Sequence, residues 1–267
     1  MKSIKRDNTS IAYTSTGSGE ITLLFVHGSY IDQSYWSKQV EYFKDSFKVV
    51  TIDLPGHGKS GRERQHWSIV GFADDVLAVI DRLGLQQVIL VGHSMGAEIS
   101  LIVASKSEKV IGFVSIDYFK NAATALPAEI VQNTLENLKK DFEGTNEYYV
   151  RTGLLTEKTS NEIADRVVQD YRNAYKPMGL AIMPDMFNAY TLEQALLPRL
   201  KVTLHLINVD YFPLNEAPLK EHVVNGYDVV TIHGTCHFPM LENPDALNDA
   251  LDQQIHKIRE SLTPVVV

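Results

Sequence analysis

Cysteine is almost absent from this chain of 267 residues, which contains a single one, Cys236. No disulfide can form within the chain, so a small secreted fold held together by disulfides is excluded. No apolar run approaches the length that spans a bilayer, and the start, MKSIKRDNTSIAYTSTG, lacks the apolar segment of a signal peptide. We therefore expect a cytoplasmic protein that is not associated with membranes.

Basic residues are also in short supply. Lys and Arg number 25 against 33 Asp and Glu, which gives a formal net charge of −8 at pH 7. Because such a surface does not attract polyanions, nucleic acid is not an expected partner. The hydrophobic content of 44% is that of an ordinary globular protein. We expect a small-molecule substrate and a monomer or homodimer.

Apolar runs and helical patterns alternate along the first half of the chain. This alternation predicts an α/β fold whose mostly parallel central sheet is flanked by helices. Residues 71–84 read as an amphipathic helix that ends at Gly84, and a last helix follows Asn243-Pro244 as N-cap and first position. The expected strands are residues 21–28, 47–56, 88–94, 110–117, 202–210 and 227–234.

The middle of the chain breaks this alternation. Residues 119–190 contain no strand-like run, and apolar positions recur there at helical spacing. We expect a helical insertion over 119–190 and a core domain built from residues 1–118 and 191–267.

The stretch GHSMG holds Ser94 between Gly92 and Gly96, directly after the apolar run VILV. A helical pattern follows, so Ser94 is expected at a sharp turn from strand to helix, the nucleophile elbow of the G-x-S-x-G motif. Glycines on both sides let such a turn close. A serine hydroxyl is a weak nucleophile, so it needs a base and a group that orients the base.

The segment HGTCHFPMLENP after the last expected strand offers two candidate bases, His233 and His237. His237 is preferred because it lies in the loop beyond the strand end, where an imidazole can reach the serine. An oxyanion hole needs two backbone N–H donors. We expect them from Met95, directly after the nucleophile, and from Ser29 in the loop after the strand LLFV.

Four features together resemble the α/β-hydrolase superfamily over nearly the whole chain: His27-Gly28, DLPGHGKS at residues 53–60, GHSMG, and HFPMLENP at residues 237–244. The resemblance implies the α/β-hydrolase fold, with the helical insertion as a cap after the sixth strand. It also implies that Asp53 and His57 are structural, and no metal or cofactor is expected.

The resemblance leaves the triad acid open. The family usually places an aspartate after the seventh strand in a G-x-x-D turn, whereas this chain reads INVDYFP, with a turn that looks one residue short. Asp210 in that turn is the expected acid. Asp117 after the sixth strand is the alternative, because some family members place the acid there, and a weak or absent acid is a third possibility.

The residues expected to border the substrate are large and apolar or aromatic: Tyr30, Trp36, Tyr118, Phe119, Met183, Tyr211 and Phe238. They favour a carboxylesterase-like serine hydrolase acting on a small or medium, uncharged, largely apolar ester. Cofactor-free haloperoxidases and C–C bond hydrolases use the same triad and stay open. A further alternative is a small-molecule receptor or signalling hydrolase with slow turnover.

Overall fold

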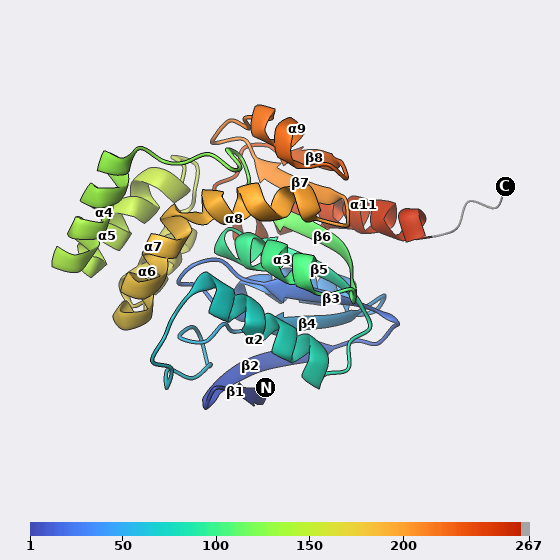
Figure 1. Ribbon diagram of the computed structural model, residues 1–267. Coiled ribbons are helices and arrows are strands. Elements are labelled where there is room, and N and C mark those ends of the chain that lie inside the picture. The colour runs from blue at the N-terminus through green and yellow to red at the C-terminus, as the bar shows by residue number, and fades with distance from the viewer. Residues whose placement is uncertain (263–267) are drawn as a thin grey trace.

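The structure, a computed structural model, describes residues 1–262 (Figure 1). Residues 263–267, the end of the expected core segment, lie outside the described part. Eight strands form one sheet in the order β1-β2-β4-β3-β5-β6-β7-β8. The pairs β1–β2 and β2–β4 are antiparallel and all other neighbours are parallel. The expected α/β-hydrolase sheet is therefore confirmed.

The strands are β1 Lys2–Arg6, β2 Thr9–Thr16, β3 Ile21–Val26, β4 Lys48–Ile52, β5 Gln87–His93, β6 Val110–Ile116, β7 Leu204–Val209 and β8 Tyr227–Ile232. The α-helices are α1 Ser37–Phe43, α2 Ile69–Arg82, α3 Met95–Lys106, α4 Ala128–Lys140, α5 Phe142–Tyr149, α6 Asn161–Arg172, α7 Lys176–Phe187, α8 Ala189–Leu196, α9 Ala217–His222, α10 Pro239–Glu242 and α11 Pro244–Leu262. Two 3₁₀ turns, η1 Gln33–Trp36 and η3 Leu197–Arg199, and a π-helical turn, η2 Val150–Leu154, complete the chain.

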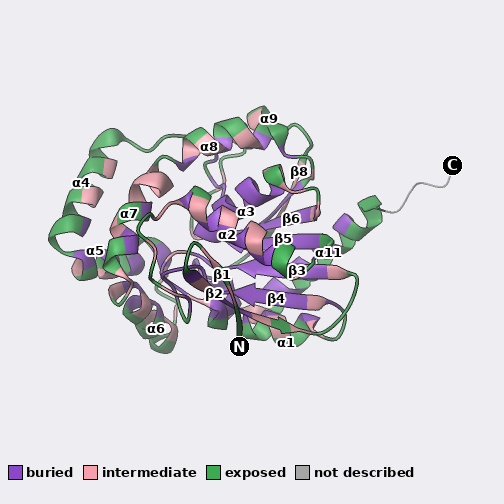
Figure 2. Ribbon diagram, turned by 60° about the horizontal axis from the view of Figure 1, so that its bottom comes forward, coloured by how far each residue is buried: buried purple, intermediate pink, exposed green. Residues whose placement is uncertain are grey.

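All six expected strands are present. Strands β3–β7 are apolar runs that are buried between two layers of helices, whereas β8 at the edge of the sheet is only partly buried. Helices α2, α3 and α8 form the layer in front of the sheet in Figure 1, and α1 and α11 contact each other and its other face. Figure 2 shows the central strands as largely buried and the outer sides of the helices as exposed. The hairpin β1–β2 was not predicted, because its strands contain no apolar run. It turns at Asp7 and Asn8 with φ of 49° and 62°.

Helix ends agree with the local signals. Helix α2 begins at Ile69, two residues before the expected start, because the Ser68 hydroxyl accepts the Gly71 N–H. Gly84 follows it with φ of 62°, as a C-cap glycine should. The expected cap of the last helix is also present, since the Asn243 side chain accepts the Ala246 N–H.

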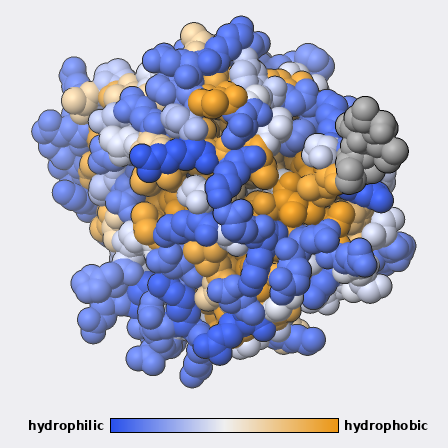
Figure 3. Space-filling view, turned by 45° about the vertical axis from the view of Figure 1, so that its right-hand side comes forward, coloured by the Kyte–Doolittle hydropathy of each residue, from blue (hydrophilic) through white to orange (hydrophobic). Residues whose placement is uncertain are grey.

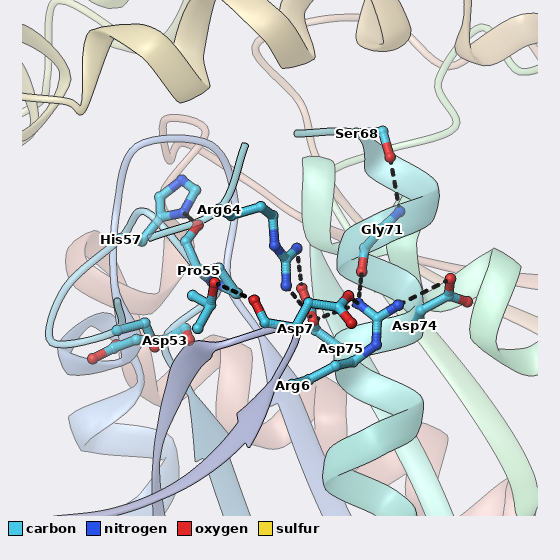
Figure 4. Close-up of polar contacts among 12 residues, drawn as sticks. Arg6, Asp7, Asp53, Pro55, His57, Arg64, Ser68, Gly71, Asp74 and Asp75 are labelled. Atoms are coloured by element: carbon cyan, nitrogen blue, oxygen red, sulfur yellow. Dashed lines mark hydrogen bonds and ion pairs between the residues drawn. The ribbon is translucent and has the colours of Figure 1, made fainter. Parts of the chain in front are cut away.

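A buried ion-pair network fastens the N-terminal hairpin to α2 (Figure 4). The Asp75 carboxylate accepts two hydrogen bonds of 2.6 Å from Arg64 and one of 2.8 Å from Arg6. The Asp75 side chain is fully buried, so these cations compensate the cost of burying its charge.

The register of the parallel strands positions the site. Val26 pairs with Gly92, and Gly92 pairs with Ser115, so β3, β5 and β6 end at the same edge of the sheet. Ligands of open α/β sheets bind at this carboxyl edge. The residues that leave it, 27–29, 94 and 117, are those that the sequence singled out.

The described chain between β6 and β7 contains helices and helical turns and no β-strand. Helices α4–α7 lie together beyond the carboxyl edge of the sheet, at the left of Figure 1, whereas α8 runs along α3. Helix α8 also crosses the expected boundary at residue 190, because the chain leaves the insertion through Ala189–Leu196 before it enters β7.

Hydrophilic side chains cover most of the face shown in Figure 3, with smaller hydrophobic areas between them. Within residues 1–262, no helix combines the length and the apolar character needed to cross a membrane.

Candidate active site

Ser94 lies between β5 and α3 with φ of 53° and ψ of −123°, a conformation that residues with side chains rarely adopt. The two flanking glycines are required sterically. A Cβ on Gly92 would lie 2.4 Å from the Gly96 carbonyl oxygen, and one on Gly96 would lie 2.2 Å from that of Val26. The tight packing of strand against helix thus forces the serine outward, and Ser94 lines a cavity.

The residue before the nucleophile ties the elbow to the histidine loop. The buried His93 ring donates a 2.8 Å hydrogen bond through Nε2 to the His237 carbonyl, and the two ring centres are 4.5 Å apart. Burial, followed by the proximity of His237, holds the pKa of His93 well below its usual range, so this imidazole is neutral. The neutral His93 ring therefore holds the backbone of His237 close to Ser94 through this hydrogen bond.

His237 also lines the cavity that Ser94 enters. Its Nδ1 lies 2.5 Å from Oδ2 of Asp117. Since a carboxylate can only accept, Nδ1–H donates to it, and in the neutral form of the ring Nε2 is then the nitrogen without a proton. The Tyr211 hydroxyl approaches the same Nδ1 at 3.3 Å. The backbone of His237 is held as well, because its N–H donates to the Leu154 carbonyl.

Asp117 follows β6 and its carboxylate is almost completely buried. Its Oδ1 accepts the Val209 N–H at 3.1 Å and lies 2.6 Å from Nζ of Lys120. Burial alone would raise the pKa of Asp117, but the hydrogen bond and charge of His237, together with Lys120, outweigh it and lower that pKa below its usual value. Asp117 is therefore an ionised carboxylate at neutral pH.

Asp210, the acid expected from the sequence, contacts the other histidine. Its Oδ2 lies 3.0 Å from Nδ1 of His233, and its Oδ1 accepts the Gly234 N–H at 2.8 Å. Both side chains are exposed, at 41% for Asp210 and 78% for His233. The structure thus places Asp117, the alternative, against His237, whereas the short turn after β7 directs Asp210 toward the β8 loop.

The expected oxyanion donors flank the nucleophile. Met95 is the first residue of α3, where backbone N–H groups lack helical partners, and Ser29 lines the cavity with Ser94. A Cβ on Gly28 would lie 3.2 Å from Cβ of Ser94, so the backbone leading to Ser29 passes close to the nucleophile. The two amides remain our prediction for the oxyanion hole.

The cavity has a volume of about 520 Å³ and lies between the carboxyl edge of the sheet and the helical insertion. Five of the seven expected substrate contacts line it: Tyr30, Tyr118, Phe119, Met183 and Tyr211. Trp36 and Phe238, also expected there, are not among its lining residues. Both are fully buried beneath the site, where Trp36 packs on Phe25 and Phe238 packs on the His93 ring.

Several lining residues were not found from the sequence. Tyr149 and Tyr171 come from the insertion, whose helices give no indication of which side faces the site. Lys120 is another, although its position three residues after a candidate acid is a signal that could have been used. Glu193 of α8 also lines the cavity, and its carboxylate accepts the Ala123 N–H at 2.5 Å.

The loop DLPGHG supports the site from below, as the resemblance implied. Asp53 accepts N–H groups from Gln33 and Lys59, both at 2.9 Å. Gly58, at φ of 47°, leaves room for that carboxylate, since a Cβ there would lie 2.5 Å from it. His57 bonds to the Pro55 carbonyl (Figure 4) and its burial lowers its pKa well below the usual value. These side chains shape loops and stay away from the reacting groups.

Within residues 1–262, no group of three or more His, Cys, Asp and Glu side chains is arranged to hold a metal ion. A parallel sheet with a serine elbow at its carboxyl edge, facing a buried His–Asp pair, defines the class of α/β hydrolases.

Comparison with known proteins agrees with this class. The profile of the alpha/beta hydrolase family matches residues 23–250, so the chain belongs to that family. A karrikin insensitive 2 receptor from Petunia hybrida is 24% identical over 90% of this chain and 93% of its own. A pimeloyl-[acyl-carrier protein] methyl ester esterase from Wigglesworthia glossinidia brevipalpis is 26% identical over 85% of this chain and 91% of its own.

Solved structures share the fold. A thermophilic esterase from Thermogutta terrifontis superposes with a TM-score of 0.80 at 22% identity, covering 94% of each chain. An enzyme that degrades N-acyl homoserine lactones superposes with a TM-score of 0.82 at 22% identity, covering 94% of this chain and 99% of its own.

Proposed function

We propose that this protein is a serine hydrolase that cleaves a small or medium, uncharged, largely apolar ester. Ser94 is the nucleophile, His237 the base and Asp117 the acid. The observation that carries the proposal is the 2.5 Å contact between His237 and Asp117 in the wall of the cavity that Ser94 lines. Such a pair is what converts a serine hydroxyl into a nucleophile.

The reaction follows from the tautomer. Unprotonated Nε2 of His237 accepts the Ser94 proton as Oγ attacks the ester carbonyl, and Asp117 stabilises the imidazolium that forms. The N–H groups of Ser29 and Met95 bind the oxyanion. His237 then gives the proton to the departing alkoxide, which leaves an acyl group on Ser94. Water, activated by the same imidazole, releases the acid and restores the serine.

The substrate class follows from the lining. Aromatic and aliphatic side chains predominate in the cavity, and the ammonium of Lys120, which also lines it, is neutralised by Asp117. An anionic substrate would therefore find no free cation at this point. The methyl ester esterase among the relatives supports an ester as the substrate.

The test is a panel of p-nitrophenyl esters and thioesters of graded acyl length, with fluorophosphonate labelling in parallel. We expect one label on the native protein and none on Ser94→Ala, with turnover lower by on the order of 10⁵. Ser105→Ala, on the same helix but donating only to the Ile102 carbonyl, is the matched control and should label normally. Labelling that persists in Ser94→Ala would refute the assignment.

A second candidate is a small-molecule receptor that retains the triad, which the relative from Petunia hybrida favours. It predicts slow turnover on the whole panel, a rise in melting temperature with a small ligand, and capture of a specific protein partner only when that ligand is present. Assays for peroxide-dependent halogenation and for C–C bond cleavage cover the other chemistries of the same triad.

A further inference from the structure

Lys120 is a buried lysine in contact with the triad acid. Its side chain is 9% exposed and the Asp117 side chain is 1% exposed, with Nζ 2.6 Å from Oδ1. Nζ also donates to the Val209 carbonyl at 2.7 Å and lies 4.3 Å from the centre of the Tyr211 ring. Burying an ammonium group costs free energy unless the charge is paired. The Asp117 carboxylate is the charged partner of Lys120.

The two oxygens of Asp117 have separate tasks. Oδ1 receives Lys120 and the Val209 N–H, whereas Oδ2 faces Nδ1 of His237. The backbone of Asp117 is left-handed, at φ of 48°, which by itself is unfavourable for a residue with a side chain. Lys120 and Val209 together therefore fix the rotation that aims Oδ2 at the histidine.

The other titratable groups packed around the Asp117–His237 pair carry no charge near neutral pH. Burial raises the pKa of Tyr149 and Tyr211, and it raises that of Cys236 to about 12. Burial and His237 lower the pKa of His93 well below its usual range. Among these neighbours, Lys120 alone adds a charge to the pair.

We propose that Lys120 is a positioning residue of the triad, which orients the Asp117 carboxylate and balances its charge so that the acid–base pair resists protonation in weakly acidic solution. The proposal rests on the proposed function of Ser94, His237 and Asp117. Its physical basis is that a nearby cation disfavours the uptake of a further proton, whereas an unbalanced carboxylate favours it.

The test measures how the rate of fluorophosphonate labelling at Ser94, and kcat/KM for the best ester, depend on pH. In Lys120→Met we expect the acidic midpoint of both profiles to rise by about one pH unit, because the cation is gone. At the optimum pH, kcat should fall roughly ten- to a hundredfold with little change in KM, since the carboxylate is less well oriented. Lys120→Arg keeps a cation and should restore the wild-type midpoint.

Lys109→Met is the matched control, because Lys109 forms an exposed 2.7 Å ion pair with Asp81 away from the cavity. It should leave both profiles unchanged. If Lys120→Met does not fold, Lys120→Gln removes the same charge and takes its place. A folded neutral variant whose midpoint stays at the wild-type value overturns the proposal. Failure of the wild type to label at Ser94 would instead refute the proposed function, and the role of Lys120 with it.

Discussion

Backbone strain is concentrated on a few residues around the cavity. Tyr30, Ser94, Asp117 and Phe119 all have left-handed torsions, with φ between 48° and 63°, and all four line the cavity. Each such residue costs on the order of 1–3 kcal/mol unless the surrounding structure holds it in place. At Ser94 and Asp117 the strained torsion orients a side chain to which we assign a catalytic role.

The sequence favours Asp210 as the acid, whereas the contact with His237 supports Asp117, the acid that we propose. Replacement of the triad acid by its amide disfavours the tautomer that the base needs, so Asp117→Asn should lower kcat by roughly 10⁴. Asp210→Asn should lower kcat less than about tenfold, because Asp210 is at the surface and bonds to the exposed His233 and Gly234. Steady-state kinetics of the two purified variants decide between them, and the opposite ranking would return the acid to Asp210.

The two candidate bases, His237 and His233, can be compared in the same way. His237→Ala should lose turnover by roughly 10⁵, because the triad works as a unit, while His233→Ala should keep most of it. In the wild type, activity should rise with pH on the acidic side, since only the neutral imidazole accepts the serine proton. Initial rates across a pH series, with thermal melts to verify folding, provide the measurement. A dead His233→Ala beside an active His237→Ala would exchange their roles.

At the scale of elements, α3 and α8 meet at two buried carboxyl groups, Glu98 and Glu193. Neither Glu98 oxygen has a hydrogen-bond partner by geometry among the described residues. Burial, and then the charge of Glu193, raises the pKa of Glu98 well above its usual value. A group whose folded pKa is raised stabilises the fold fully below its unfolded pKa, and that contribution is lost as the pH rises through the folded pKa.

Glu98→Gln removes this titration, so the variant should gain stability relative to the wild type as the pH increases from about 5 to 9. The gain corresponds to roughly 2–4 °C in melting temperature for each kcal/mol. Melting curves at several pH values measure it, with Glu129→Gln on the exposed face of α4 as the control. A melting-temperature difference that does not vary with pH would contradict the raised pKa.

At the scale of the whole molecule, the cavity is lined both by the core domain and by the helical insertion. Its floor carries Ser94, Asp117 and His237 from the sheet edge, and its roof carries Tyr149, Tyr171 and Met183 from the helical insertion. We therefore expect the insertion to act as a lid that selects substrates by the length of the acyl chain, while the chemistry stays on the core.

Met183→Ala should enlarge the roof. We expect KM for the longer esters to change several-fold, while kcat for the smallest ester stays near the wild-type value, because the triad is untouched. Leu180→Ala, on the same helix but outside the lining, is the matched control. The acyl-length panel gives the measurement, and equal changes for all chain lengths would argue against a selective roof.

Much of this protein was determined by local sequence. Buried strands are apolar runs, glycines stand where a Cβ would clash at the elbow, and Asn243-Pro244 begins the last helix, because each of these depends on neighbours within a few residues. The position of Ser94 at the end of a strand follows from such signals. The expected hydrolase fold followed from their combination.

Only the tertiary structure decided which aspartate meets His237 and which aromatic side chains reach the cavity. Asp117 and Asp210 follow adjacent strands, so the sequence places both near the same edge. The choice depends on one left-handed torsion at Asp117 and on a lysine and an amide, Lys120 and Val209, that hold the carboxylate. Trp36 and Phe238 look like pocket residues, yet they fill the core under the histidines. Contacts across 120 positions of the chain, such as that between Asp117 and His237, leave no local pattern, because packing in three dimensions creates them.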